Sequence, residues 1–418
     1  MIQAAKGTKD ILPSESLAWQ FLETKFLEVC RLFGYGEIRV PTFEATELFQ
    51  RGVGDTTDVV QKEMYTFIDR GDRSITLRPE ITAGVVRAYM EHGLFNLPSP
   101  QKLCYNHTAF RYEKMGKGRF REFHQFGCEC FGSSEASADV ELIALLHTFF
   151  KSVGLKDISL HINAIGCPEC RGQYLEKLKD FLRPHLNELC RDCQNRFERN
   201  PMRSLDCKNE KCQAIIADAP VPMDCLCENC QKHFDSVCEQ LTAMRLPFTV
   251  DKHIVRGLDY YTRTVFEFVS DNVGTQGTIC GGGRYDNLVE EIGDRSVPAV
   301  GFALGVERLL LELEAQGVKF KTGITPTLQL IYFPDTASYA QSLALRLREA
   351  GIATEIDVCA RSFKAQMKYA NKLGAKYVIV IGEAEQDTGK AILKRMADAH
   401  EEDCILDDIA QLARLMEV

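Results

Sequence analysis

The segment 109–130, AFRYEKMGKGRFREFHQFGCEC, constrains the fold more than any other part of the chain. Two stretches with the composition of β-strands flank a basic loop that contains Gly116 and Gly118. Strands separated by a short glycine-containing loop are typical of a hairpin. The sequence therefore predicts two paired strands with a basic connection between them.

The polar residues of this hairpin are spaced so that they can act together. Residues an even number of positions apart share one face of a strand, so Arg111 would project beside Glu113. Gln125 and Glu129 would share a face of the return strand in the same way. For any one of these residues alone, an ordinary exposed hairpin with cross-strand ion pairs is the better explanation.

Three further polar clusters lie in glycine-punctuated, otherwise apolar segments. They are TLRPEIT (76–82), VRGLDYYTRTVFEF (255–268), and GGGRYDNL with AVGFALGVERLLLEL (281–313). In the last, apolar residues surround Arg308 on nearly every helical face. Because a guanidinium is almost never buried unpaired, we expect Arg308 to meet an anion.

Apolar periodicity outlines the elements around these clusters. It predicts amphipathic helices over 15–33, which stops at Gly34, and over 139–153. Short strands are expected at 37–39 and 158–163. The composition then changes to paired cysteines and charged helical stretches, which indicates an insertion at 166–246.

The last part of the chain alternates between strand and helix patterns. The predicted strands are LQLIYFP, ATEIDV, KYVIVIG and AILKRM, and the predicted helices are TASYAQSLALRLREAG, SFKAQMKYANKLG and one at the C-terminus. Alternation of this kind is typical of a small α/β domain with a largely parallel sheet. We place the boundary near residue 325, which gives domains 1–325 and 326–418.

Nine of the seventeen cysteines fall between Cys167 and Cys230. Pairs with this spacing suit tetrahedral thiolate sites, and eight ligands would serve two zinc ions. The candidate ligands are Cys167, Cys170, Cys190, Cys193, Cys207, Cys212, Cys227 and Cys230. An insertion that merely holds reduced thiols explains the pattern as well, and an iron–sulfur cluster is a third alternative.

The bulk composition sets wider limits. A hydrophobic content of 45% over 418 residues is enough for a large core, and the N-terminus lacks a signal-peptide pattern. No stretch approaches the roughly 20 apolar residues of a membrane span, so we expect a cytoplasmic protein. Because the cytosol keeps thiols reduced, the seventeen cysteines are not expected to form a disulfide framework. The net charge of −9 does not favour indiscriminate binding of nucleic acid, but it leaves room for a local basic face.

Taken together, these motifs resemble those of histidyl-tRNA synthetases, which are class II aminoacyl-tRNA synthetases. The resemblance rests on TLRPE, FRYE followed by a basic loop and FHQFGCE, VRGLDYYTRTVFEF, GGGRYD and GFALGVERL. VRGLDYY is the specific motif, because FRxE and GxxxGxxR alone mark only class II enzymes in general. The resemblance implies an α+β catalytic domain on an antiparallel sheet, with a cysteine-rich helical insertion and a C-terminal α/β anticodon-binding domain.

The resemblance also implies roles for the charged residues. Arg111 would hold the α-phosphate of ATP, Glu113 the adenine amino group and Arg308 the γ-phosphate, with Mg²⁺ accompanying the nucleotide. Arg256 would be the catalytic cation that stabilises charge as the carboxylate of histidine attacks the α-phosphorus. The guanidinium group suits these tasks because it stays charged and binds phosphate oxygens in two places.

For the amino acid, the resemblance implies a pocket of hydrogen-bonding side chains. Glu80, Thr82 and Gln125 would surround the α-ammonium and carboxylate groups, while Glu129 and Tyr261 would bind the two imidazole nitrogens. Tyr260 and Tyr285 would line the same pocket, although each could equally be a buried core tyrosine. An imidazole has a donor and an acceptor edge, which a carboxylate and a phenol can bind together.

The tRNA contacts follow from the resemblance and from charge. Lys114 stands in the hairpin loop where the family often has an arginine that contacts the acceptor end of tRNA(His). In the C-terminal domain, Arg361, Lys364, Lys368 and Lys372 recur at helical spacing, with no acid between Val358 and Gly382. The stripe is either a solvated helix face or, as the lack of acids favours, a surface for the nucleic-acid backbone.

The segment GEIRVPTFE (36–44) resembles a class II interface motif and predicts a homodimer. Two other functions compete. A catalytically silent regulator of ATP phosphoribosyltransferase would resemble the catalytic domain, but usually lacks the arginine of RGLDYY and the anticodon domain. A zinc-dependent nucleic-acid-binding protein would leave the arginine motifs unexplained.

Overall fold

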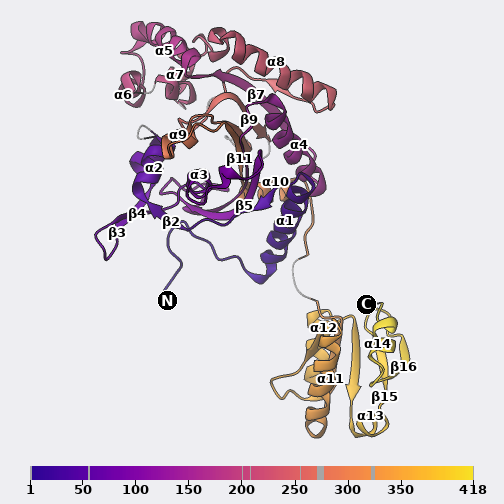
Figure 1. The fold of residues 1–418 in the computed structure, drawn as a ribbon. Coiled ribbons are helices and arrows are strands. Elements are labelled where there is room, and N and C mark those ends of the chain that lie inside the picture. Colours follow the sequence, from indigo (N-terminus) through magenta and orange to yellow (C-terminus); the bar gives the residue numbers. More distant parts are fainter. Residues whose placement is uncertain are drawn as a thin grey trace. The chain divides into compact units, whose positions relative to one another are not determined.

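The computed structural model describes residues 2–54, 57–199, 201–207, 209–254, 256–270, 277–321 and 325–417. The chain divides into two compact units, 1–321 and 322–418 (Figure 1). Among the described residues, no helix is both long and apolar enough to cross a membrane.

The first unit is built on an eight-stranded sheet. In spatial order its strands are β1 (Gly36–Glu37), β5 (Gln101–Phe110), β6 (Glu122–Phe131), β11 (Ala299–Gly305), β10 (Thr278–Arg284), β9 (Thr262–Val269), β7 (Ser159–Gly166) and β8 (Thr249–Val250). All inner pairs are antiparallel, as the resemblance implies, whereas the edge pairs β1·β5 and β7·β8 are parallel.

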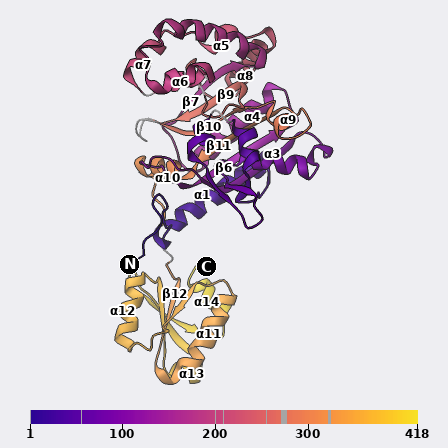
Figure 2. The ribbon, with the colours of Figure 1, turned by 90° about the vertical axis from the view of Figure 1, so that its left-hand side faces the viewer.

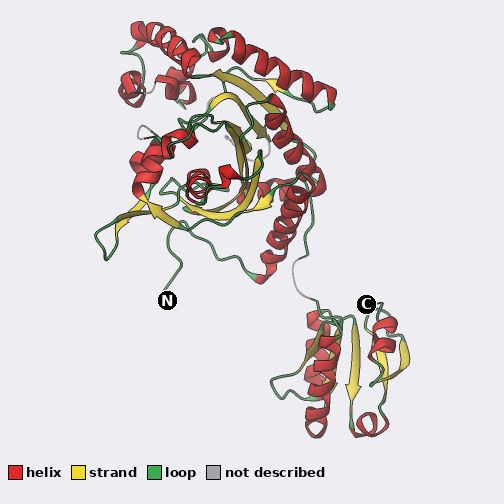
Figure 3. Ribbon diagram, in the orientation of Figure 1, coloured by secondary structure: helices red, strands yellow, loops and turns green. Residues whose placement is uncertain are grey.

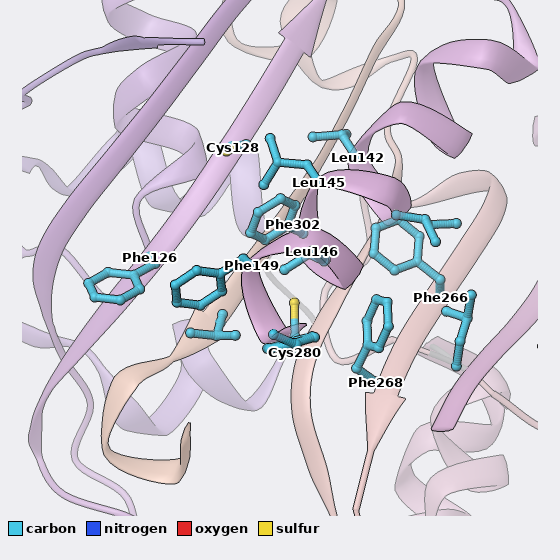
Figure 4. Close-up of a cluster of buried hydrophobic side chains, with 14 of the residues drawn as sticks. Phe126, Cys128, Leu142, Leu145, Leu146, Phe149, Phe266, Phe268, Cys280 and Phe302 are labelled. Carbon is cyan, nitrogen blue, oxygen red and sulfur yellow. The ribbon is translucent and has the colours of Figure 1, made fainter. Parts of the chain in front are cut away.

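One face of this sheet packs on helices. The main helices here are α1 (Pro13–Leu32), α4 (Ala136–Ser152), α8 (Glu228–Ala243) and α10 (Val306–Ala315). Side chains of α4, such as Phe149, interdigitate with Phe126 of β6 and Phe302 of β11 (Figure 4). The predicted first helix is confirmed, and it ends before Gly34, whose φ of 78° suits a glycine.

The other face of the sheet curves around α3 (Thr82–Glu91) (Figures 1 and 3). Alternation along β6 sends Phe126 and Cys128 into the α4 core, and therefore Gln125 and Glu129 to the α3 side. Around α3 lie α2 (Thr46–Val53), the helical turns η1 (Val59–Glu63) and η2 (Leu94–Asn96), α9 (Leu288–Ile292), and a small sheet of β2 (Phe43–Ala45), β4 (Ser74–Leu77) and β3 (Tyr65–Ile68).

The prediction that Arg111 and Glu113 project from a strand is wrong. Strand β5 ends at Phe110, so both residues lie in the loop that follows. Ladder pairing stops because the Tyr112 amide donates to the Glu63 carbonyl and the Glu113 amide turns back to the Arg111 carbonyl. The loop thus leaves the sheet.

The insertion is helical (Figure 2), and in the sequence it lies between the paired strands β7 and β8. Besides α8 it contains α5 (Pro168–Leu182), α6 (Arg191–Arg199), α7 (Glu210–Ile216) and the short turns η3 (Arg183–His185), η4 (Pro201–Asp206) and η5 (Pro222–Cys225). It has a small core of its own, in which cysteines replace part of the usual aliphatic content.

The second unit is a five-stranded α/β domain. Its strand order is β13 (Thr354–Ile356), β12 (Leu328–Tyr332), β14 (Tyr377–Ile381), β15 (Lys390–Arg395) and β16 (Glu401–Ile405). The first three strands are parallel, as predicted, and the last two are antiparallel additions. Its helices are α11 (Ala337–Glu349), α12 (Phe363–Leu373), α13 (Glu383–Thr388) and α14 (Ile409–Leu415), with a turn η7 (Pro334–Thr336) before α11.

Candidate active site

Two adjoining cavities lie on the α3 side of the large sheet. The larger has a volume of about 360 Å³ and the smaller about 230 Å³. Arg111, Glu113, Gln125 and Arg256 line both of them, so the two spaces form one continuous site. Every residue that the sequence assigned to histidine lines the larger cavity, and Arg308 lines the smaller one.

Two glycines keep the floor of the site open. A Cβ on Gly301 would lie 1.6 Å from a Glu129 carboxylate oxygen, and one on Gly281 would lie 2.1 Å from Nη2 of Arg256. Any side chain at these positions would displace the Glu129 carboxyl group or the Arg256 guanidinium group. The glycines therefore let these two polar side chains lie flat on the sheet.

Glu129 is the most deeply buried acid of the larger cavity. Its carboxylate accepts hydrogen bonds from Thr82 Oγ1 at 2.7 Å, from the Tyr105 hydroxyl at 3.0 Å, and from the Tyr285 hydroxyl. Burial raises the pKa of the Glu129 carboxyl to about 8, even though these donors favour the charged form. Near neutral pH, the Glu129 side chain is therefore largely protonated.

Glu80 lies at the beginning of α3. Its carboxylate oxygens accept the backbone N–H groups of Thr82 and Ala83, each at 2.8 Å, which satisfies two donors at the helix terminus. Burial raises the pKa of the Glu80 carboxyl above its ordinary value. This residue thus fixes the start of α3 and also supplies an acid to the cavity wall.

The rest of the larger cavity is aromatic and amide-lined. The ring centroid of Tyr260 lies 4.7 Å from that of Tyr261 and 5.5 Å from that of Tyr285. The side-chain oxygen of Gln125 is buried and has no hydrogen-bond partner in the described part of the chain. A buried acceptor without a partner at a cavity wall suits a ligand that brings a donor.

Arg256 lies where the two cavities meet. Its guanidinium forms an ion pair with one carboxylate oxygen of Glu267. The other oxygen of Glu267 accepts a hydrogen bond from Thr278 Oγ1 at 2.7 Å. Although burial opposes the charge, Glu267 holds the pKa of Arg256 above its ordinary value. A permanently charged, oriented cation therefore points at the junction.

The smaller cavity collects the remaining arginines. Arg111 donates through Nε to the Pro79 carbonyl at 2.8 Å, and its guanidinium lies 5.4 Å from the centroid of the Phe123 ring. Arg308 donates to the Thr278 carbonyl at 2.6 Å. Burial and the nearby Arg119 lower the pKa of Arg308, because both oppose its positive charge.

Several residues of the site were not assigned from the sequence. Tyr105 lies in the middle of a strand, where a core role is the ordinary expectation. Arg119 lines both cavities and lies 3.5 Å from Glu113, and its place in the basic loop was the signal. Glu267 could have been suggested by a lone acid in the apolar run VFEF.

None of the candidate tRNA contacts is among the residues that line the two cavities. Lys114 is exposed in the hairpin loop. On α12, Lys364, Lys368 and Lys372 are also exposed. Arg361 differs, because Asp357 pairs with it at 2.6 Å and Tyr369 packs under its guanidinium at 4.3 Å.

The eight candidate metal ligands form two four-cysteine groups. The first, which we call the base cluster, contains Cys167, Cys170, Cys227 and Cys230. The second, the tip cluster, contains Cys190, Cys193, Cys207 and Cys212. Within each cluster all sulfur atoms lie within 4.8 Å of one another, and all eight thiols are free of disulfides. Tetrahedral zinc thiolate sites have sulfurs about 3.8 Å apart, so both clusters fit such an ion.

Backbone amides support this arrangement. The amide of Cys227 donates to Cys170 Sγ at 3.0 Å, and that of Cys190 donates to Cys212 Sγ at 3.1 Å. Such hydrogen bonds favour thiolate over thiol and are common around metal-bound sulfur.

Comparison with known proteins agrees with this geometry. Residues 7–309 match the histidyl-tRNA synthetase family, and residues 328–414 match the anticodon binding domain. The chain is 55% identical to the histidine–tRNA ligase of Acetivibrio thermocellus over 98% of each chain. Its fold superposes on apo histidyl-tRNA synthetase of S. aureus with a TM-score of 0.84, at 40% identity and over 99% of each chain.

A regulatory subunit/histidyl-tRNA synthetase structure from Bacillus halodurans also matches, with a TM-score of 0.64 over 91% of this chain and 98% of that one. At 24% identity, that likeness shows a common fold only. Full-length identity of half or more is found with histidine–tRNA ligases, which favours the ligase over the silent regulator. The chain belongs to the histidyl-tRNA synthetase family.

Proposed function

We propose that the two cavities bind histidine and ATP side by side and that the chain joins histidine to tRNA(His) through histidyl-adenylate. One observation carries the proposal. The buried acid and tyrosine cavity around Glu129 opens directly onto the arginine-lined cavity, with Arg256 at the junction.

Histidine occupies the larger cavity. Glu129 and Tyr261 bind the imidazole nitrogens, while Tyr260 and Tyr285 enclose the ring. Gln125 offers its unpaired oxygen to the α-ammonium group, and Glu80 with Thr82 completes that end of the pocket. A site built on such hydrogen bonds rejects analogues that leave its polar groups unpaired.

MgATP occupies the smaller cavity. Arg111 binds the α-phosphate and Arg308 binds the γ-phosphate. Glu113 accepts a hydrogen bond from the adenine amino group. A carboxylate oxygen of histidine attacks the α-phosphorus, and the bond to the bridging oxygen breaks, so that pyrophosphate leaves. Arg256 stabilises the charge that develops on the α-phosphoryl oxygens, because it is fixed in place before the reaction.

In the second step, a terminal ribose hydroxyl of tRNA attacks the carbonyl carbon of the adenylate and AMP leaves. Lys114 attracts the acceptor end of the tRNA. The α12 lysines bind the tRNA backbone near the anticodon, whereas Arg361, just before that helix, is paired with Asp357.

Three further properties belong to this proposal. The two cysteine clusters each hold one structural zinc ion. The chain works as a homodimer, supported by exposed apolar residues on the small sheet, namely Phe43, Phe67 and Ile68. Its compartment is the cytoplasm, which its many free thiols favour.

Exchange of labelled pyrophosphate into ATP tests the activation step. Exchange should require histidine and magnesium, and Arg256→Ala should reduce it at least about 10²-fold. Arg295→Ala is the matched control, because that arginine is exposed and lines neither cavity of the site. Exchange without histidine, or undiminished exchange in Arg256→Ala, would contradict the proposal.

A further inference from the structure

The base cluster joins the first residues of the insertion to the start of its last helix, α8. Cys167 follows directly on β7 and Cys170 lies in the first turn of α5, whereas Cys227 and Cys230 begin α8. Gly166 makes this possible, since a Cβ there would lie 2.4 Å from the Cβ of Cys170, and its φ of 75° suits a glycine. An ion in this cluster would therefore fix the first turn of α5 to the sheet.

Arg171, the next residue on α5, contacts a loop that forms part of the wall of the proposed histidine cavity. Its Nη1 donates to the Asp259 carbonyl at 3.0 Å, and its Nη2 donates to the Tyr261 carbonyl. These carbonyls belong to the loop 256–261, which carries Arg256, Tyr260 and Tyr261 into the site. A guanidinium fork on two carbonyls of one loop fixes the path of that backbone.

The tip cluster has a similar neighbour. Cys193 and Arg196 lie three positions apart on α6 and so share a face of that helix. Arg196 forms an ion pair with Asp58 at 3.0 Å, and Asp58 lines the larger cavity. The insertion thus contacts two separate segments of the cavity wall, each through an arginine within one turn of a cysteine cluster.

We propose that Arg171 is a positioning residue for histidine binding, held in place by a metal ion in the base cluster, and that Arg196 steadies a second part of the same wall. The inference rests on the function proposed above. It makes the cysteine-rich insertion part of the machinery for amino-acid recognition. Loss of the ion would loosen the 256–261 loop and weaken histidine binding before it affected ATP.

Steady-state pyrophosphate exchange with purified full-length protein tests this inference. Arg171→Ala should raise the KM for histidine about tenfold, because both hydrogen bonds from the charged group are lost. The KM for ATP should stay within about twofold, since Arg171 holds the carbonyls of Asp259 and Tyr261, and Tyr261 lines only the larger cavity. Arg171→Lys keeps the positive charge but cannot donate to both carbonyls from a planar group, so it should give an intermediate KM for histidine.

Arg183→Ala is the control, because Arg183 is an exposed arginine of the same insertion that pairs only with Asp180 among the contacts described. It should leave both KM values unchanged. Zinc content, measured by elemental analysis, should be equal in wild type, Arg171→Ala and Arg183→Ala. Replacing Cys167 and Cys170 by Ser should remove one zinc ion and raise the KM for histidine, with little further effect from adding Arg171→Ala.

The possible results separate the two proposals. If the wild-type protein shows no histidine-dependent exchange, the proposed function fails. If it does, and Arg171→Ala has a wild-type KM for histidine, the positioning role fails. A fall in kcat and in the melting temperature, together with equal rises in both KM values, would also overturn it, because that would indicate a structural residue only. Should Arg171→Ala not fold, Arg171→Lys decides the same question.

Discussion

At the scale of single residues, the protonation of Glu129 bears on the histidine binding proposed above. Its pKa of about 8 means that the Glu129 carboxyl is mostly protonated at pH 7. The imidazole of free histidine has a pKa near 6.5. A neutral imidazole facing a protonated Glu129 has the same number of protons as an imidazolium facing a carboxylate, so one shared proton satisfies the pair.

This sharing predicts a bell-shaped pH dependence of histidine binding. Below about pH 6.5 both partners are protonated, and above about pH 8 neither is, so affinity should fall on both sides. Glu129→Gln should weaken binding and remove the decline above pH 8. Isothermal titration between pH 5.5 and 9 checks this, and an affinity that kept rising above pH 8 would contradict it.

Most residues of the site could be predicted because their motifs resemble a known family, but the partners that orient them could not. Arg256 and Glu129 were identified in advance. Tyr105 lies on β5, the strand next to that of Glu129, and Glu267 lies on β9, which follows the loop that carries Arg256. Single-sequence periodicity reveals neither contact.

At the scale of elements, α12 presents lysines on one face. Arg361 is neutralised locally by Asp357, so Lys364, Lys368 and Lys372 are the residues that can exchange counterions with tRNA. Replacing all three by Ala should raise the KM for tRNA, leave pyrophosphate exchange unchanged, and lower the salt dependence of tRNA binding by roughly one unit of slope per lost phosphate contact.

The matched control replaces three exposed lysines elsewhere, Lys151, Lys232 and Lys390. Equal tRNA affinity and salt slope in both triple variants would show that α12 has only a solvated face.

The insertion gives a second prediction at this scale. Protein purified without chelator should contain two zinc ions per chain, and chelation should lower the melting temperature, because metal binding stabilises the folded state. Cys190→Ser should lose the ion of the tip cluster, while Cys359→Ser, at an exposed cysteine outside both clusters, should lose none. Absence of both zinc and iron, with all seventeen thiols titrating, would show that the insertion is metal-free.

Elements with strong periodicity were predicted well, and weakly patterned ones were missed. The helix at α1 and the parallel strands of the second unit follow from apolar spacing. Strand β16 has the sequence EEDCI and exposes four of its five residues, so it carries almost no apolar signal. Its pairing with β15 depends on tertiary context.

At the scale of the whole molecule, the small sheet exposes apolar side chains that a partner would cover. Ile68 is 63% exposed and Phe43 54%. Light scattering at micromolar concentration should give about twice the chain mass of 47.1 kDa. Ile68→Lys should shift the equilibrium toward monomer, because it places an unpaired charge in the interface, whereas Leu345→Lys, on α11, should not. A wild-type protein that stayed monomeric would argue against the dimer.

Transfer of histidine to tRNA tests the central claim most directly, because it needs both cavities and both units of the chain. Purified full-length protein should be incubated with MgATP, unfractionated tRNA and all twenty amino acids, each labelled in turn. We predict that histidine alone becomes attached, and to tRNA(His) alone. Failure to charge tRNA with histidine under conditions that support a known histidine–tRNA ligase, or attachment of another amino acid instead, would contradict the account.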